Sequence, residues 1–81
     1  MRVGAVMQRY RDWDRDSGVE AYEIGEESIT VQFQDGSAYL YTFTVTGRSH
    51  VERMITLAQQ GDGLNAYINE AVGKRYARRL R

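Results

Sequence analysis

No part of the chain restricts its fold more than residues 28–45, where apolar and polar side chains alternate and only Asp35-Gly36 interrupts the pattern. A period of two residues is typical of a β-strand with one buried face, and Asp-Gly is typical of a turn. The segment therefore predicts two antiparallel strands, over 28–34 and 37–45, that form a hairpin.

One strand is predicted before this hairpin and two helices after it. Residues 19–24 are rich in strand-forming side chains, and 25–27 form a short loop, so three strands make an antiparallel meander. Apolar stripes at helical spacing then predict helices over 51–58 and 64–72, with Gly61 ending the first. Strands followed by helices predict an α+β fold in which both helices pack on one face of the sheet.

Both ends of the chain are also predicted to be helical. An apolar stripe that includes Tyr10 and Trp13 predicts a short N-terminal helical extension over 1–16. At the other end the last stripe extends to Tyr76, so the second long helix can continue through Gly73 toward the C-terminus. A glycine inside a helix costs about 1 kcal/mol relative to alanine, so a break at Gly73 is the alternative.

The length of the hairpin loop decides which face the tyrosines occupy. A two-residue loop would place Tyr39 and Tyr41 on the polar face, where exposed rings form a stacking platform for single-stranded nucleic acid. A three-residue loop with a left-handed Gly36 would pair Val31 with Tyr39 and move both tyrosines to the apolar face. We expect the second register because it gathers the apolar side chains on one face. The predicted core contains Ile29, Val31, Phe33, Tyr41, Phe43, Met54, Ile55, Leu64 and Ile68.

Charged side chains are unevenly distributed although the formal net charge is zero. Residues 12–35 contain eight acidic side chains and one basic one, whereas 73–81 contain five basic side chains and no acidic one. The basic segment predicts either a surface for an anionic partner or a solvated helix end, where the helix dipole favours cations. Ten of the eleven basic residues are arginine, which fits phosphate recognition and equally a compositional bias.

Two functional hypotheses follow. The first is nucleic-acid binding, with RNA as the expected ligand and basic side chains contacting phosphates. Its candidate residues are Arg48, Arg53, Lys74, Arg75, Arg78, Arg79 and Arg81. The second is a protein-interaction module or a homo-oligomer, in which the apolar stripe around Tyr10 and Trp13, or an open sheet edge, binds a partner or a second copy.

Catalysis and metal binding are not expected. The chain has no cysteine and only one histidine, His50, so it lacks the residues for a zinc site or a catalytic triad. Acidic side chains match calcium-ligand positions of an EF-hand loop at Asp12, Asp14, Asp16 and Glu23. However, Ser17 replaces the required glycine, and a strand rather than a helix is predicted next. We therefore expect a non-catalytic binding module without a cofactor or a metal.

The location of the protein is predicted from what the sequence lacks. Its N-terminus has no apolar core of a signal peptide, and no apolar run approaches the roughly 18 residues that a membrane span needs. The absence of cysteine is typical of a reducing compartment. We expect a soluble, cytoplasmic protein that does not associate with membranes.

Four segments carry a resemblance to a known family. Residues 29–41, Ile-Thr-Val-Gln-Phe-Gln-Asp-Gly-Ser-Ala-Tyr-Leu-Tyr, resemble the strand–turn–strand signature of KTSC domains, which are named for a C-terminal segment of lysyl-tRNA synthetases. The resemblance continues at 52–54, at 57–58 and in the Gly-Asp-Gly-Leu-Asn-Ala-Tyr-Ile segment of 61–68. It extends over about residues 17–80, most of the chain.

Residues 16–25 are similar to the small stand-alone members of this family. The resemblance implies one KTSC-like domain over 1–81, with a hairpin-rich sheet and two helices. An RNA-binding role has been suggested for the family, and no enzymatic activity is established for it.

Overall fold

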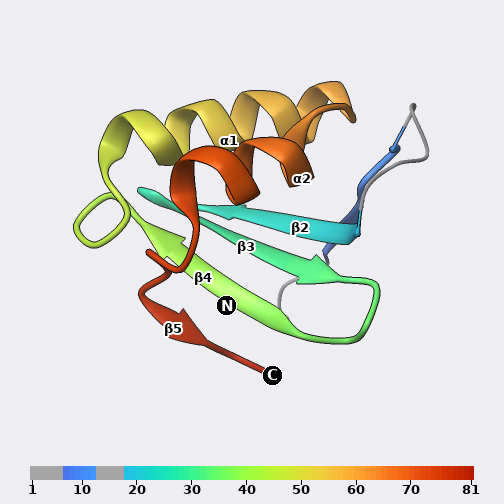
Figure 1. The fold of residues 1–81 in the computed structure, drawn as a ribbon, viewed down its shortest axis with the longest axis horizontal. Coiled ribbons are helices and arrows are strands. Elements are labelled where there is room, and N and C mark those ends of the chain that lie inside the picture. The colour runs from blue at the N-terminus through green and yellow to red at the C-terminus, as the bar shows by residue number, and fades with distance from the viewer. Residues whose placement is uncertain (1–6, 13–17) are drawn as a thin grey trace, which may run out of the picture.

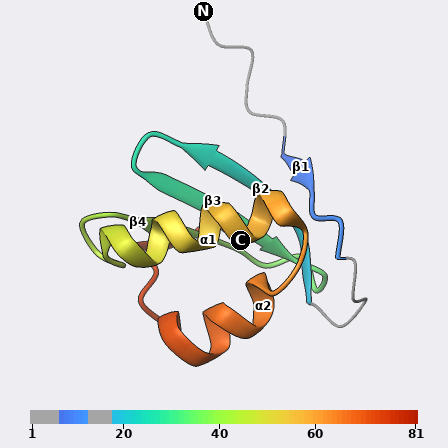
Figure 2. The same cartoon turned by 90° about the horizontal axis from the view of Figure 1, so that it is seen from above.

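An antiparallel sheet forms one layer of the molecule, and two helices that cover one of its faces form the other (Figures 1 and 2). The structure, a computed structural model, describes residues 7–12 and 18–81. Its elements are β1 (Gln8–Arg9), β2 (Val19–Gly25), β3 (Ser28–Phe33), β4 (Ala38–Thr42), α1 (Arg48–Gln60), α2 (Leu64–Tyr67), the π-helical turn η1 (Ile68–Val72) and β5 (Arg78–Arg79). In these described residues the sheet has five strands, which lie in chain order. None of the helices in the same residues is long and apolar enough to cross a membrane.

The β3–β4 hairpin has the register that a three-residue loop predicts. Val31 lies opposite Tyr39, and Gly36 has a φ of 93°, a conformation that L side chains rarely adopt. The carboxylate of Asp35 accepts hydrogen bonds from the Ser37 backbone N–H at 2.9 Å and the Ser37 hydroxyl at 2.6 Å. Local turn chemistry therefore fixes the register, and the tyrosines of β4 face the helices.

The helices cover the apolar face of the sheet and enclose the core. Six of the nine predicted core side chains are buried, namely Ile29, Val31, Tyr41, Met54, Leu64 and Ile68. The other three, Phe33, Phe43 and Ile55, are partly buried and pack against the core. Phe33 is the last residue of β3, and it lines an open cleft instead of filling the centre of the core.

The N-terminal segment contains a strand where a helix was predicted. β1 pairs with the free edge of β2, and Tyr10 beyond it is only 3% exposed. The Tyr10 hydroxyl accepts a 3.1 Å hydrogen bond from the backbone N–H of Leu64, at the start of α2. The helical prediction is wrong here because an isolated short helix is marginal in water, whereas pairing with β2 satisfies backbone groups. Most of the predicted extension over 1–16, including Trp13, lies outside the described residues.

The C-terminal segment is also a strand, so the predicted basic helix is wrong and the alternative break at Gly73 is confirmed. Gly73 follows η1 with a φ of 59°, and the chain then returns along β4. In β5, Arg79 lies opposite Tyr39 and Arg78 lies opposite Leu40. The helix stops because Gly73 takes a positive-φ backbone conformation that L side chains rarely adopt, and the tail covers the edge of β4 that would otherwise be unpaired.

Candidate functional site

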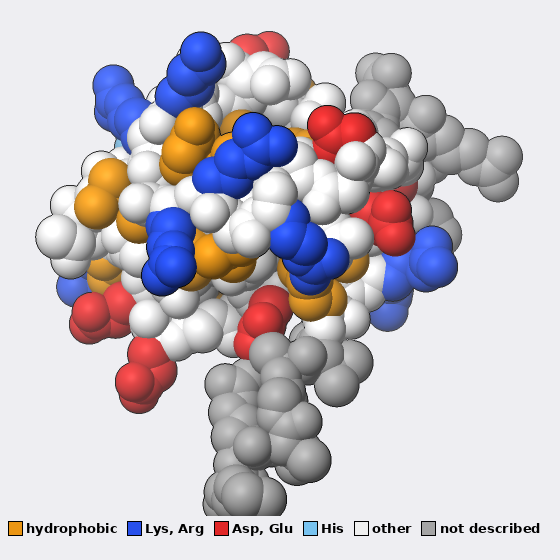
Figure 3. Space-filling view, turned by 90° about the horizontal axis from the view of Figure 1, so that it is seen from below, with side chains coloured by type: hydrophobic (Ala, Val, Ile, Leu, Met, Phe, Trp, Pro, Cys, Tyr) orange, Lys and Arg blue, Asp and Glu red, His pale blue; other side chains and the backbone are white. Residues whose placement is uncertain are grey.

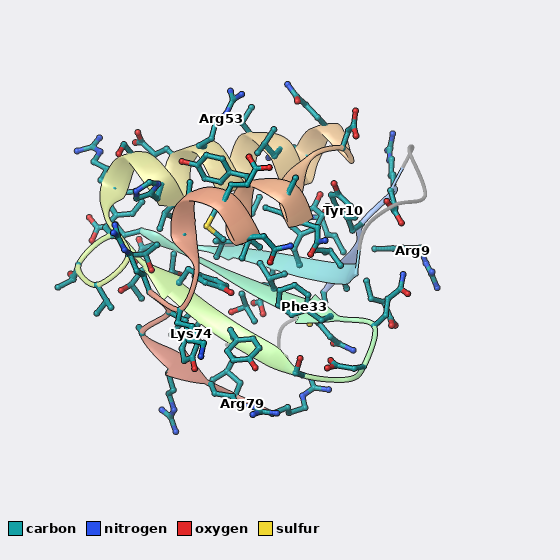
Figure 4. All side chains as sticks on the ribbon, viewed as in Figure 1. Arg9, Tyr10, Phe33, Arg53, Lys74 and Arg79 are labelled. Atoms are coloured by element: carbon teal, nitrogen blue, oxygen red, sulfur yellow. The ribbon has the colours of Figure 1, made fainter. Side chains whose placement is uncertain are left out.

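A cleft of about 300 Å³ opens between the β3–β4 hairpin and the segment that follows η1. We call it the aromatic cleft. Rings supply most of its wall, from Phe33, Tyr39, Tyr41 and Tyr76, and Asn69 and Lys74 add polar groups. Figure 4 shows Phe33, Lys74 and Arg79 on this side of the molecule, near the β4 and β5 end of the sheet.

The cleft exists because the helical layer ends before it covers the whole sheet. Tyr39 and Tyr41 are two residues apart in β4, so both face the helices. Gly73 ends η1 and reverses the chain, which carries Tyr76 back across the sheet to a ring contact with Tyr39. Tyr41 is buried beneath this contact, whereas Tyr39 and Tyr76 are only partly buried.

The rings of the aromatic cleft hold one another in place. The centroids of Tyr39 and Tyr76 are 4.6 Å apart, with the ring planes tilted by 47°. Phe33 meets Tyr39 edge to face at 5.9 Å, and Tyr41 meets Tyr76 edge to face at 6.3 Å. These separations lie in the favourable range for aromatic pairs, roughly 4.5–7 Å. The partly exposed rings are therefore positioned before any ligand arrives.

Two cations flank these rings. The guanidinium carbon of Arg79 lies 5.5 Å from the centroid of the Tyr39 ring, a cation–π contact. The Nε–H of Arg79 donates to the backbone carbonyl of Arg81 at 2.8 Å, which further orients the side chain. Lys74 is itself one of the residues that line the cleft, whereas Arg79 reaches it only through Tyr39. A ligand in the aromatic cleft would therefore meet positive charge beside aromatic surface.

A carboxylate lies near this end of the sheet. Hydrogen bonds from the Ser37 hydroxyl and backbone N–H lower the pKa of Asp35, and the charge of Arg79 lowers it slightly further. Asp35 is therefore ionised at neutral pH and already occupied by Ser37.

The other predicted phosphate-binding side chains do not gather around the aromatic cleft. Arg53 lies on the outer side of α1, far from Lys74 and Arg79 (Figure 4). Arg48 donates to Glu52 at 3.0 Å and lies over the ring of Phe43. The seven candidates therefore do not form one continuous basic surface.

The opposite face of the sheet carries a second group of basic side chains. Neighbouring residues of β5 point to opposite faces, so Arg78 lies beside Leu40 on the side away from the helices. Figure 3 shows this side, where basic side chains are separated by apolar and acidic ones. Arg75 and Arg81 are exposed in the segments that flank β5, and neither is among the residues that line the aromatic cleft.

The two residues of the protein-interaction hypothesis, Tyr10 and Trp13, are not among the residues that line the aromatic cleft. Tyr10 belongs to the core, so its ring is not available to a partner. Trp13 lies outside the described residues. The outermost strands of the described sheet are the two-residue strands β1 and β5. β1 pairs only with Ala21 and Tyr22 of the seven-residue strand β2, so part of that edge has no strand partner among the described residues.

His50, in the first turn of α1, is partly buried. Its Nδ1 lies 2.8 Å from the hydroxyl of Tyr67, which joins α1 to α2. Glu23 lies within β2, so the EF-hand pattern is followed by a strand, as predicted. Within residues 7–12 and 18–81, no three His, Cys, Asp or Glu side chains are grouped so that they could hold a metal ion.

Lys74 and Arg79 were candidates from the sequence, but their aromatic neighbours were not. Tyr39 was assigned to the core because its register places it on the apolar face, and Tyr76 was assigned to a helical stripe. One signal was available in Gly73, because a helix that ends there cannot cover the far end of β4. That signal indicates an opening, although it does not indicate which rings line it.

No protein-family model matches the chain, and neither the curated proteins nor the solved structures contain a match to it. The KTSC resemblance therefore stays a prediction, and the functional argument rests on the geometry of the aromatic cleft.

Proposed function

We propose that the protein is a non-catalytic module that binds single-stranded RNA, with an unpaired base held against the rings of the aromatic cleft. The observation that carries this proposal is the contact of Arg79 with Tyr39, a ring that lines the aromatic cleft, while Lys74 lines the same cleft. Partly exposed rings beside cations are the usual means by which proteins bind single strands. The resemblance of residues 29–41 to KTSC domains supports the same ligand.

Stacking on the rings and attraction to the cations would each contribute to the binding free energy. Stacking of a base on an aromatic ring contributes about 1–3 kcal/mol, and it is available only when the base is unpaired. Tyr39 and Tyr76 already touch, so the base stacks on an exposed ring face and not between them. Lys74 and Arg79 would contact the phosphates on either side.

The size and charge of the cleft favour a nucleotide over other ligands that bind aromatic rings. A volume of about 300 Å³ is at the small end of ligand sites and suits a single base. Aromatic cages also bind quaternary ammonium groups, but here Lys74 and Arg79 would repel a cation. An acceptor-rich, negatively charged partner is the better match to these groups.

The test is fluorescence anisotropy with a short, labelled, unstructured RNA across a series of salt concentrations. Arg79→Gln should weaken binding and flatten the salt dependence, because each phosphate contact contributes about −0.7 to the slope of log affinity against log salt. Arg53→Gln is the matched control, since it makes the same change on the far side of α1. It should leave affinity nearly unchanged.

Two further ligands define what is recognised. An RNA duplex of the same length should bind more weakly, because its bases are not free to stack, and a DNA strand of the same sequence shows whether the ribose contributes. Equal losses for Arg79→Gln and Arg53→Gln would indicate diffuse charge attraction and contradict the proposed site. If the folded wild-type protein binds no RNA near physiological salt, the proposal is wrong. The protein-interaction hypothesis then leads, with Trp13→Ala as the next variant.

A further inference from the structure

We propose that Phe43 and Arg48 form a second base-stacking site, and that one RNA strand contacts this site and the aromatic cleft together. We call this pair of residues the Phe43 site. The inference rests on the proposed RNA binding and extends it from one base to a short stretch of unpaired strand. The protein would then prefer single strands that are long enough to reach both sites.

The Phe43 site repeats the arrangement of Tyr39 and Arg79. The guanidinium carbon of Arg48 lies 5.5 Å from the centroid of the Phe43 ring. The separation between Arg79 and the Tyr39 ring is the same, 5.5 Å. Both rings are partly buried and pack against the core. A partly exposed ring beside an arginine offers stacking for a base and a contact for a phosphate in one place.

Local hydrogen bonds hold Phe43 in position. Its backbone N–H donates to the carbonyl of Glu27 at 2.9 Å, and its carbonyl accepts from the N–H of Gly47 at 3.1 Å. Phe43 directly follows β4, the strand that carries Tyr39. The two residues are an even number of positions apart, and both pack toward the core. One strand and its continuation therefore present both rings on the same face of the sheet.

Arg48 is available to a ligand although it forms an ion pair. Its Nε–H donates to Glu52 at 3.0 Å, but a guanidinium has five N–H groups. The side chain of Arg48 is 74% exposed, and that of Glu52 is 53% exposed. Exposed ion pairs of this kind are weak, so a phosphate can share Arg48 with Glu52 or replace it.

The segment that follows η1 joins the two sites. Tyr76 lines the aromatic cleft. One residue earlier, the carbonyl of Arg75 accepts a 2.6 Å hydrogen bond from the hydroxyl of Thr46, which lies in the turn between Phe43 and α1. Lys74 and Arg75 are both exposed and lie on this connecting segment. A strand that passes from one site to the other would therefore cross positive charge.

The separation of the two sites determines the length of strand that can use both. Residues 39 and 43 are four positions apart, which corresponds to about 13 Å at roughly 3.3 Å per residue of a β-strand. Successive bases of a stacked strand are about 3.4 Å apart, so about four nucleotide steps cover this distance. A dinucleotide can reach only one of the two sites, whereas a strand of about eight nucleotides can reach both.

The experiment compares a dinucleotide with an unstructured strand of about eight nucleotides, on the wild-type protein and on Phe43→Leu. Leucine keeps an apolar side chain against the core but offers no ring for stacking. Phe43→Leu should weaken binding of the longer strand by about 5- to 100-fold, the range for one stacked base. Binding of the dinucleotide should change little, because the aromatic cleft remains. A thermal melt checks that the variant is folded.

Arg48→Gln tests the same site without changing the core. It should weaken binding of the longer strand and reduce the slope of log affinity against log salt by about 0.7, the contribution of one phosphate contact. Arg53→Gln is the matched control, since it makes the same change in the same helix, on its outer side (Figure 4). It should leave affinity and slope nearly unchanged. Equal effects of the two variants would indicate diffuse charge attraction and overturn the inference.

The binding data separate this inference from the proposed function. The inference requires that Phe43→Leu and Arg48→Gln both weaken the longer strand, and Arg48→Gln decides alone if Phe43→Leu does not fold. If Arg79→Gln weakens RNA binding but these variants do not, the aromatic cleft binds RNA by itself and only the Phe43 site is wrong. If the folded wild type binds neither strand, both the inference and the proposed function are wrong.

Discussion

The two edges of the sheet have the same kind of outer strand but differ in how deeply their tyrosines are buried. Each edge consists of a two-residue strand from one end of the chain, β1 beside β2 and β5 beside β4. Each places a tyrosine near the helices. At the first edge Tyr10 is buried and its hydroxyl is bonded to the start of α2. At the second edge Tyr76 is only partly buried, and a cleft remains open beside it.

This difference shows how a small domain can form an open cleft without a separate pocket-forming element. At the Tyr10 edge the ring is buried and its hydroxyl is bonded to the start of α2, so the side chain contributes to stability, although a cavity of about 230 Å³ lies beside it between Arg9 and Gln34. The Tyr76 edge stays open because the helical layer ends at Gly73. Partly exposed rings remain there and are available for a ligand. The comparison therefore predicts that substitutions at the first edge change stability and that substitutions at the second change binding.

The largest effect is expected at the Tyr10 edge. Tyr10→Ala removes a ring that is 3% exposed and leaves the Leu64 N–H without its partner, which should cost about 3–5 kcal/mol. Small domains are stable by only about 5–15 kcal/mol, so this loss removes a large fraction of the stability. Chemical denaturation monitored by circular dichroism measures this loss. A loss below about 1 kcal/mol would show that Tyr10 does not close the core.

A smaller loss of stability is expected at the open edge. Tyr76→Ala removes a partly buried ring and its contacts with Tyr39 and Tyr41. Aromatic pairs contribute about 0.5–1.5 kcal/mol beyond the burial of their area, so we expect a loss of about 1–2 kcal/mol in the same denaturation assay. RNA affinity should fall, because one wall of the aromatic cleft is gone. If Tyr76→Ala destabilises the protein as much as Tyr10→Ala, the distinction between the two edges is wrong.

The sequence predicts the centre of the molecule better than its edges. Alternation over 28–45 and the left-handed position at Gly36 are local properties, so the hairpin and its register could be predicted. The apolar spacing around Tyr10 fits a helix equally well, and the decision depends on an unpaired edge of β2 far along the chain. Tertiary context of this kind overrides local propensity, and no local pattern reveals it.

Only the basic residues of the candidate site could be predicted from the sequence. Lys74 and Arg79 were identified because charge clusters are visible in the sequence. Tyr39 faces the helices, as its register predicts, but that register cannot show that the helices stop short of it. Sequence patterns assign a side chain to a face of the sheet, whereas the formation of a cleft depends on where the opposite layer ends.

The smallest effect concerns the titration of Tyr41 and is invisible at neutral pH. Burial raises its pKa in the folded protein to about 12, from an ordinary value of 10.0. The folded state therefore retains this proton at a pH where the unfolded chain releases it. This contribution to stability is fully present below about pH 10 and is lost as the pH rises through about 12. The melting temperature should accordingly fall across that window.

Tyr41→Phe isolates this contribution, because phenylalanine does not titrate and the other tyrosines remain. The melting temperature of the variant should decline less than that of the wild type between about pH 10 and 12, and the two should agree at neutral pH. Tyr10→Phe serves as the comparison from the Tyr10 edge and should keep the alkaline decline. Parallel curves for the wild type and Tyr41→Phe would show that the Tyr41 hydroxyl is well solvated in the folded protein.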